Sequence, residues 1–205
     1  MGTYRAPVED MNFLIDEVLD AENALGTLPD FADYGVGSEL TTALLDEAAK
    51  LAGDELAPLR RVGDEQPAIC TDGAVTAPPG YDAALRQLAE GGWIGISSDP
   101  RYGGQGLPEI YNTVGHEMWN GANMALGLAP MLSSGAALAI HAHGTEAQKQ
   151  TYLEKMNTGQ WMGTMNLTES GAGSDLGVMK AKAVPEGDHY RISGQKIYIT
   201  WGDHQ

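Results

Sequence analysis

The feature that most restricts the fold of this chain is a long uncharged run near its middle. No Asp, Glu, Lys or Arg occurs between Glu117 and Glu146. A run of that length is long enough to cross a membrane as a helix, but Pro130 and several polar residues interrupt it. The polar residues are Asn120, Asn123, Ser133, Ser134, His141 and His143. We therefore predict no membrane span, and instead two helices of small residues, broken at Pro130 and buried inside a bundle.

Apolar residues also recur at helical spacing through most of the chain before Gly159. The pattern predicts helices over residues 7–24, from Ser38 as N-cap to about Pro58, over residues 81–90, from Pro108 to about Leu128, and over residues 146–157. Gly91-Gly92 suits the left-handed close of the third of these helices, and Thr145 with Gln148 fits a capping box at the start of the last. Residues 26–37 and 62–79 carry helix-breaking Gly and Pro, which predicts a linker and a loop.

After Gly159 the hydrophobic pattern changes to the alternation that is typical of strands. It predicts strands over residues 161–167, 178–184, 190–193 and 196–200, with a turn at residues 185–188. The predicted fold class is therefore α+β, with an all-helical N-terminal domain followed by the start of an antiparallel β domain. We assign residues 1–37 to an N-terminal extension, 38–160 to the helical domain and 161–205 to the first part of the β domain.

Composition restricts the ligands that the chain can bind and the cellular compartment in which we expect it. A formal net charge of −16 and a pI near 4.4 argue against nucleic acid as a partner. A single anionic ligand is still admissible, because backbone amides can hold a phosphate locally. Cys70 is the only cysteine, so no intramolecular disulfide can form, and the N-terminus lacks the basic and apolar blocks of a signal peptide. We expect a cytoplasmic protein.

Two histidines near the end of the uncharged run do not suggest a metal site. His141 and His143 are two residues apart, so they cannot share one face of a helix. A helical zinc site needs a spacing that puts both imidazoles on the same face. We predict no metal.

Residues 162–175 carry the strongest functional signal, M-G-T-M-N-L-T-E-S-G-A-G-S-D. The predicted strand opens into a loop of small and hydroxyl residues, in which Gly171, Gly173 and Ser174 provide a backbone that can curl around an anion. About thirty residues later the chain reads Tyr198-Ile199-Thr200. Taken singly, each of these residues has an ordinary structural explanation: a strand end, a turn or a strand aromatic.

Taken together, the two blocks resemble the flavin-binding signature of the acyl-CoA dehydrogenase family. The family carries L-T-E-x-x-A-G-S-D and K-x-aromatic-I-T in this order and at this distance, after a helical domain of similar size. Further landmarks are Ala57-Pro58-Leu59, Tyr102-Gly103-Gly104 and Gly144-Thr145-Glu146. The opening of the chain, Tyr4-Arg5-Ala6-Pro7 and the F-L-I-D-E-V run, resembles the long bacterial subfamily that includes the methylmercaptopropionyl-CoA dehydrogenases. Two positions depart from the pattern: Ser170 replaces the usual Pro, and Tyr198 replaces the commoner Trp.

The resemblance implies FAD as cofactor and assigns the residues that contact it. These are Met165, Asn166, Leu167, Thr168, Gly171, Gly173, Ser174, Tyr198, Ile199 and Thr200. A flavin needs a hydrogen-bonding edge for its pyrimidine, a wall for its ring and donors for its pyrophosphate. Thr168, Tyr198 and Ser174 respectively suit these needs, and Thr200 is placed to donate to the reactive nitrogen. Ser174 is also expected near a bound acyl-CoA substrate.

The family removes an α proton from an acyl-CoA with a Glu carboxylate while a hydride passes from the β carbon to flavin. That Glu lies in a C-terminal helical domain, so the resemblance implies no catalytic residue in this chain, and Glu169 is expected to support its loop. We expect the sequence to be the N-terminal portion of a longer protein, and these 205 residues alone to bind FAD weakly and to be inactive. Electron-transfer flavoprotein as acceptor and a homo-oligomer are further expectations from the family.

Two alternatives stay open. The first alternative to the dehydrogenase interpretation is a non-catalytic binding or dimerisation module without flavin. The second is part of a same-fold flavoenzyme with another reaction. An acyl-CoA oxidase and a flavin-dependent monooxygenase are examples of the second kind.

Overall fold

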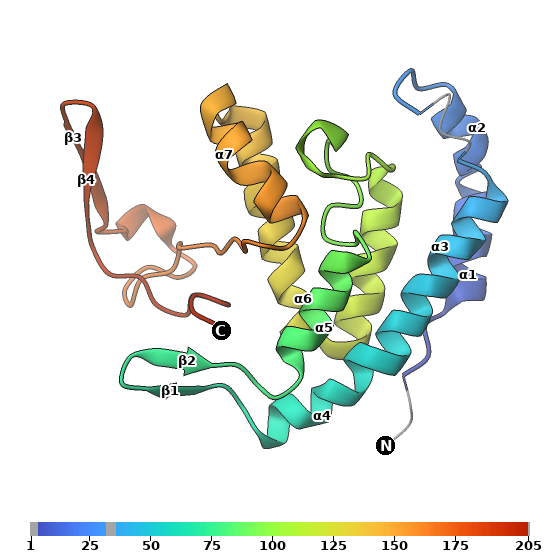
Figure 1. Cartoon of the computed structure of the whole chain (residues 1–205). Coiled ribbons are helices and arrows are strands. Elements are labelled where there is room, and N and C mark those ends of the chain that lie inside the picture. The colour runs from blue at the N-terminus through green and yellow to red at the C-terminus, as the bar shows by residue number, and fades with distance from the viewer. Residues whose placement is uncertain (1–3, 32–35, 205) are drawn as a thin grey trace.

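A computed structural model describes residues 4–31 and 36–204 of the 205-residue chain. Figure 1 shows helices gathered on one side and two thin β-hairpins extending toward the other. The α+β fold class is confirmed: a helical domain comes first and a small antiparallel sheet follows.

The first predicted helix is divided. Helix α1 (Val8–Phe13) continues as a π-helical turn (Leu14–Val18), and α2 (Ala21–Gly26) begins after Asp20, whose φ is +47°. A left-handed residue breaks the helix, and the Asp20 carboxylate accepts a hydrogen bond from Asn23 at 2.8 Å. The linker prediction over 26–37 falls partly on residues 32–35, which lie outside the described residues.

The second predicted helix is longer than expected. Helix α3 (Ser38–Leu51) begins at Ser38, with Gly37 rather than Ser38 at the N-cap, and passes through a π-helical segment (Ala52–Leu56) into α4 (Ala57–Glu65). The prediction that Pro58 ends the helix was wrong. Proline lacks an N–H, and its ring crowds the carbonyl one turn earlier; here the widened segment just before it lets the helix continue.

The predicted loop over residues 62–79 contains a hairpin. Strand β1 (Ile69–Thr71) pairs with β2 (Ala74–Thr76) in antiparallel register. Asp72 and Gly73 both have positive φ, which is the geometry of the tightest hairpin turns. The Asp-Gly pair was therefore a turn signal that the loop prediction missed.

Two helices match their predictions. Helix α5 (Tyr81–Glu90) ends at Gly91, with Gly92 left-handed at φ +74°, and α7 (Glu146–Asn157) starts with the predicted capping box. In that box Thr145 Oγ1 accepts from the amide of Gln148 at 3.3 Å.

The uncharged run forms a helical hairpin that turns at Asn123 and not at Pro130. The segment α6 (Glu109–His143) is helical throughout except at Asn123, whose φ of −156° and ψ of 88° are extended. Figure 1 shows its two arms as separate rods, yellow-green and yellow. Glu109 and Leu138, which one straight helix would place far apart, line the same cavity.

The break lies at Asn123 and not at Pro130 because Asn123 caps the second arm. Its Oδ1 accepts from the amide of Leu126 at 3.3 Å, and its Nδ2 donates to the carbonyl of Leu56 at 3.3 Å. An extended Asn that accepts from the third following amide is an N-cap. Pro130 lies inside the second arm.

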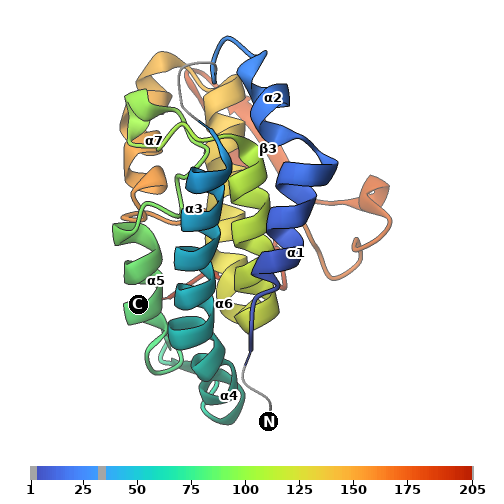
Figure 2. The same ribbon diagram turned by 90° about the vertical axis from the view of Figure 1, so that its right-hand side faces the viewer.

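Helix α6 is the one helix among residues 4–31 and 36–204 that is long and apolar enough, by length and composition alone, to cross a membrane. It is also the central hairpin of the bundle. Figure 2 shows α1 and α3 covering one side of it. The main hydrophobic core lies here, around Leu45, Leu56, Leu88, Met118 and Leu126.

The β half has fewer strands than predicted. A 3-10 turn occupies Leu176–Val178, and β3 (Lys182–Glu186) pairs with β4 (His189–Ser193), so the turn lies at Gly187 and Asp188. Residues 161–167 and 196–200 are not strands, contrary to prediction. They approach each other through single hydrogen bonds, whereas a strand requires a repeated ladder.

Candidate functional site

Two segments that are far apart in the sequence lie side by side in the structure. We call residues 162–175 the first motif segment and residues 196–201 the second motif segment. The Thr164 hydroxyl donates a hydrogen bond to the carbonyl oxygen of Thr200 at 2.6 Å. The structure thus brings together the two blocks that the sequence analysis assigned to one site.

A second set of bonds joins the segments where the first becomes a loop. The Ile197 amide donates to the Thr168 carbonyl at 2.9 Å. The Lys196 Nζ donates to the Leu167 carbonyl and to Glu169 Oε1, both at 2.9 Å. Lys196 is thus a bridge between the segments, a role that the sequence analysis did not assign, although this Lys opens the K-x-aromatic-I-T block.

Glu169 is the buried carboxylate of the site, with 8% of its surface exposed. Its Oε2 accepts from the Lys180 amide at 2.7 Å, and its Oε1 accepts from the Ala181 amide at 2.9 Å. The Lys180 amide, the Lys196 ammonium and the Ala181 amide lower the pKa of Glu169 to about 2. The residue is therefore ionised at neutral pH and is a weak base.

The first motif segment is attached to the helical domain at Gly163. Its amide donates to Ser133 Oγ, on the second arm of α6, at 3.1 Å. A Cβ at this position would lie 2.5 Å from the Cβ of Ala136, so only glycine permits the approach. This contact fixes the point at which the first motif segment leaves the helical bundle.

The loop of the first motif segment is open on one side. A Cβ added to Gly171 or Gly173 meets no protein atom within 4 Å, and Ser174 is exposed. Neither glycine has a positive φ among the described residues. The open backbone leaves room for a ligand to approach.

The other predicted site residues differ in exposure. Met165, Asn166, Tyr198 and Thr200 are exposed, and Leu167, Thr168 and Ile199 are partly buried. Tyr198 has a φ of +58°, and 87% of its surface is exposed. An exposed aromatic ring of this kind is suited to cover a flat ligand.

Trp201, which the sequence analysis did not single out, anchors the second motif segment. Its Nε1 donates to the carbonyl of Ala125, at the turn of α6, at 2.9 Å. Its ring stacks on Tyr81 with centroids 6.2 Å apart and meets His204 edge-on. An aromatic residue directly after the motif was the available signal.

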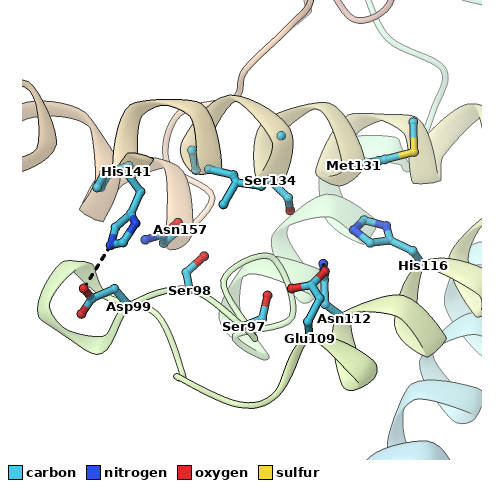
Figure 3. Close-up of a pocket in the computed structure, with 14 residues that line it drawn as sticks. Ser97, Ser98, Asp99, Glu109, Asn112, His116, Met131, Ser134, His141 and Asn157 are labelled. Atoms are coloured by element: carbon cyan, nitrogen blue, oxygen red, sulfur yellow. Dashed lines mark hydrogen bonds and ion pairs between the residues drawn. The ribbon is translucent and has the colours of Figure 1, made fainter. Parts of the chain in front are cut away.

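A separate cavity of about 440 Å³ lies between the two arms of α6, helix α7 and the loop before α6. Figure 3 shows His116 and Met131 at one end and His141 at the other, with Ser134 between them. None of the ten predicted cofactor contacts lines this cavity.

Two carboxylates, Asp99 and Glu109, line the cavity. Arg101 lies 2.6 Å from Asp99 Oδ2 and holds the pKa of Asp99 well below its ordinary value, while His141 Nε2 lies 3.2 Å from the same oxygen. At the other end His116 Nδ1 is buried without a hydrogen-bond partner in the described structure, and burial lowers the pKa of His116. Within the described residues no three His, Cys, Asp or Glu side chains form a group that could hold a metal.

The fold and the motif segments together define a class of protein, and comparison with known proteins agrees. Residues 38–160 match the acyl-CoA dehydrogenase N-terminal domain. This chain belongs to the acyl-CoA dehydrogenase family.

Individual relatives extend the match beyond that domain. The chain is 40% identical to 3-methylmercaptopropionyl-CoA dehydrogenase of Ruegeria pomeroyi over 98% of its length, and 32% identical to a butyryl-CoA dehydrogenase of Syntrophomonas wolfei, also over 98%. It covers 34% and 33% of these proteins, so it spans about a third of their length. A glutaryl-coenzyme A dehydrogenase structure, solved with glutaryl-CoA, superimposes with a TM-score of 0.69 at 26% identity, covering 82% of this chain and 40% of that one.

Proposed function

We propose that this chain supplies the helical domain and part of the FAD site of an enzyme that oxidises an acyl-CoA thioester to the 2,3-enoyl-CoA. The observation that carries the proposal is the convergence of the two motif segments, shown by the bond from Thr164 to Thr200. The two segments carry exposed hydroxyls at Ser174 and Thr200 and the exposed ring of Tyr198, and Gly171 and Gly173 have open space beside them. Family membership provides the reaction class.

Residues of the two motif segments fit the parts of FAD. The amides around Gly171 and Gly173, with Ser174, would hold the pyrophosphate, and the segment through Thr168 would meet the pyrimidine edge. Tyr198 would cover the ring. When bound, FAD would accept the hydride that leaves the β carbon of the substrate.

Glu169 is unsuited to remove the α proton. A general base needs a pKa near the working pH and a free oxygen that faces the substrate. Three donors occupy the Glu169 oxygens, and the pKa of this carboxyl is lowered to about 2. We therefore propose that the base comes from outside the two motif segments, and that these 205 residues alone have no dehydrogenase turnover.

Further parts of the proposal follow from the family. Ser174 is proposed to lie near the acyl-CoA, electron-transfer flavoprotein to accept the electrons, and the working protein to be a cytoplasmic homo-oligomer. The alternative reactions would be separated by oxygen consumption, which a dehydrogenase shows only weakly.

The first test is FAD titration of the purified chain, followed by quenching of flavin fluorescence, with Gly173→Val as the variant. A valine side chain at this position has space in the protein, because no atom lies within 4 Å of the new Cβ, but it would occupy the place of the pyrophosphate. Several charge-assisted hydrogen bonds of about 1.5–3 kcal/mol each would be lost, so affinity should fall by at least about tenfold.

Gly26→Val is the matched control. Gly26 is equally open and ends α2, on the opposite side of the molecule from the motif segments in Figure 1. The control should bind FAD like the unmodified chain. Absence of FAD binding by the unmodified chain, or equal binding by both variants, would contradict the proposal.

A further inference from the structure

We infer that Glu169 and Lys196 form a buried ionic clamp that positions the flavin-contacting backbone, rather than taking part in proton transfer. The inference deepens the proposed function and rests on it. It assigns Glu169 and Lys196 as positioning residues.

The clamp connects three stretches of chain. Glu169 lies in the first motif segment, its amide partners Lys180 and Ala181 precede β3, and Lys196 opens the second motif segment. The four bonds to oxygen at the Glu169 carboxylate and the Lys196 ammonium are 2.7 to 2.9 Å long, counting the one from Lys196 to the Leu167 carbonyl, and the ammonium also lies 3.7 Å from the sulfur of Met179. One carboxylate and one ammonium thus fix the relative position of the three stretches.

Burial makes this pair different from the surface ion pairs of the same half. The exposed fractions of the Lys196 and Glu169 side chains are 22% and 8%. In the pair between Arg191 and Glu186 they are 73% and 47%. A buried charge that loses its partner is left uncompensated, whereas an exposed pair contributes little.

The position of the clamp explains why it would act on FAD binding. The Lys196 ammonium donates to the Leu167 carbonyl, and the Ile197 amide donates to the Thr168 carbonyl. The ion pair therefore adjoins the edge proposed for the pyrimidine. Glu169 is also bridged to Ala172 by hydrogen bonds of 3.1 Å in both directions, which shapes the loop that holds the open glycines. Removing the clamp would therefore loosen both contacts with the cofactor at once.

The experiment compares Glu169→Gln, Lys196→Met and the double variant with the unmodified 205-residue chain. FAD affinity is measured by fluorescence titration, and hydrogen exchange of the Ala181 and Ile197 amides is measured without FAD. Each single variant should weaken FAD binding by about tenfold or more, as loss of an outer-shell partner commonly does. Both amides should lose protection, and the double variant should bind FAD about as weakly as the weaker single variant, because both substitutions remove the same contact.

Glu186→Gln is the matched control, since it makes the same substitution in an exposed ion pair of the β half. It should leave FAD affinity and both amides unchanged, and circular dichroism of the helices should be the same in all variants. Unchanged amide protection in Lys196→Met, or lost protection with unchanged FAD affinity, would overturn the inference. Because the exchange measurement needs no flavin, failure of the unmodified chain to bind FAD would count against the proposed function alone.

Discussion

Two ionisable side chains in this protein are held in different protonation states, the buried Glu169 ionised and the partly buried His116 neutral. Glu169 is surrounded by donors, which keep its carboxylate ionised and lower its pKa to about 2. His116 lies in a cavity where its Nδ1 has no partner within the described structure, and burial favours the neutral imidazole. The first arrangement holds a loop in place, and the second makes stability sensitive to pH.

His116 should reduce stability as the solution becomes acidic. Burial lowers the pKa of the folded imidazole below its ordinary value of 6.5, so the unfolded chain binds the proton more readily. The free energy of unfolding should therefore fall as pH drops below about 6.5, and His116→Gln should weaken that dependence. Urea unfolding at pH 7.5 and about pH 5 measures the effect.

Other ionisable groups face the same cavity, so the comparison must be between variants. Glu109, which opposes the shift, Asp99 and His141 all line it. His143→Gln removes an exposed histidine at the end of the second arm of α6 and is expected to keep the dependence of the unmodified protein. Equal slopes in the unmodified protein and His116→Gln would show that His116 does not contribute.

At the scale of elements, the sequence predicts those helix ends that depend on neighbouring residues alone. Helices α5 and α7 match because each has its own end signal, a glycine pair and a capping box. Pro58 and Pro130 were both taken as breaks, yet neither ends a helix. Pro58 follows the widened π-helical segment, and Pro130 is buried inside the second arm; neither feature can be recognised from the neighbouring sequence.

Asn123 shows the opposite case, since a single polar residue that was not expected to break the helix makes the turn of α6. Asn123→Ala would remove the cap of the second arm and leave the Leu56 carbonyl and the Tyr81 hydroxyl without this partner. The cap contributes about 1 kcal/mol and an unsatisfied buried group costs about 1–3 kcal/mol, so we expect a loss of about 2–3 kcal/mol. Thermal or urea unfolding measures it.

Asn112→Ala is the control for this substitution, since Asn112 lies on the first arm and donates to Glu109 at a more exposed position. It should cost about 0.5 kcal/mol or less. A similar loss in both variants would mean that Asn123 has no special place in the hairpin.

At the scale of the whole molecule, a few contacts hold the second half against the first. Gly163 bonds to Ser133, and Trp201 bonds to Ala125 and stacks on Tyr81. The two motif blocks could be read from the sequence as short patterns. The residues that align them, Lys196 and Trp201, could not be assigned roles, because their partners lie 27 and 76 positions away.

The hairpin of α6 has a consequence for the order in which the chain folds. Its arms are joined through the single extended residue Asn123, so closing them costs little loop entropy. The contacts of the second half bring together residues 36 and 76 positions apart, which is slower. Pulsed hydrogen exchange during refolding should protect α6 amides before that of Ile197, and protection in the reverse order would contradict it. The bundle would then be the template on which the cofactor-binding half is assembled.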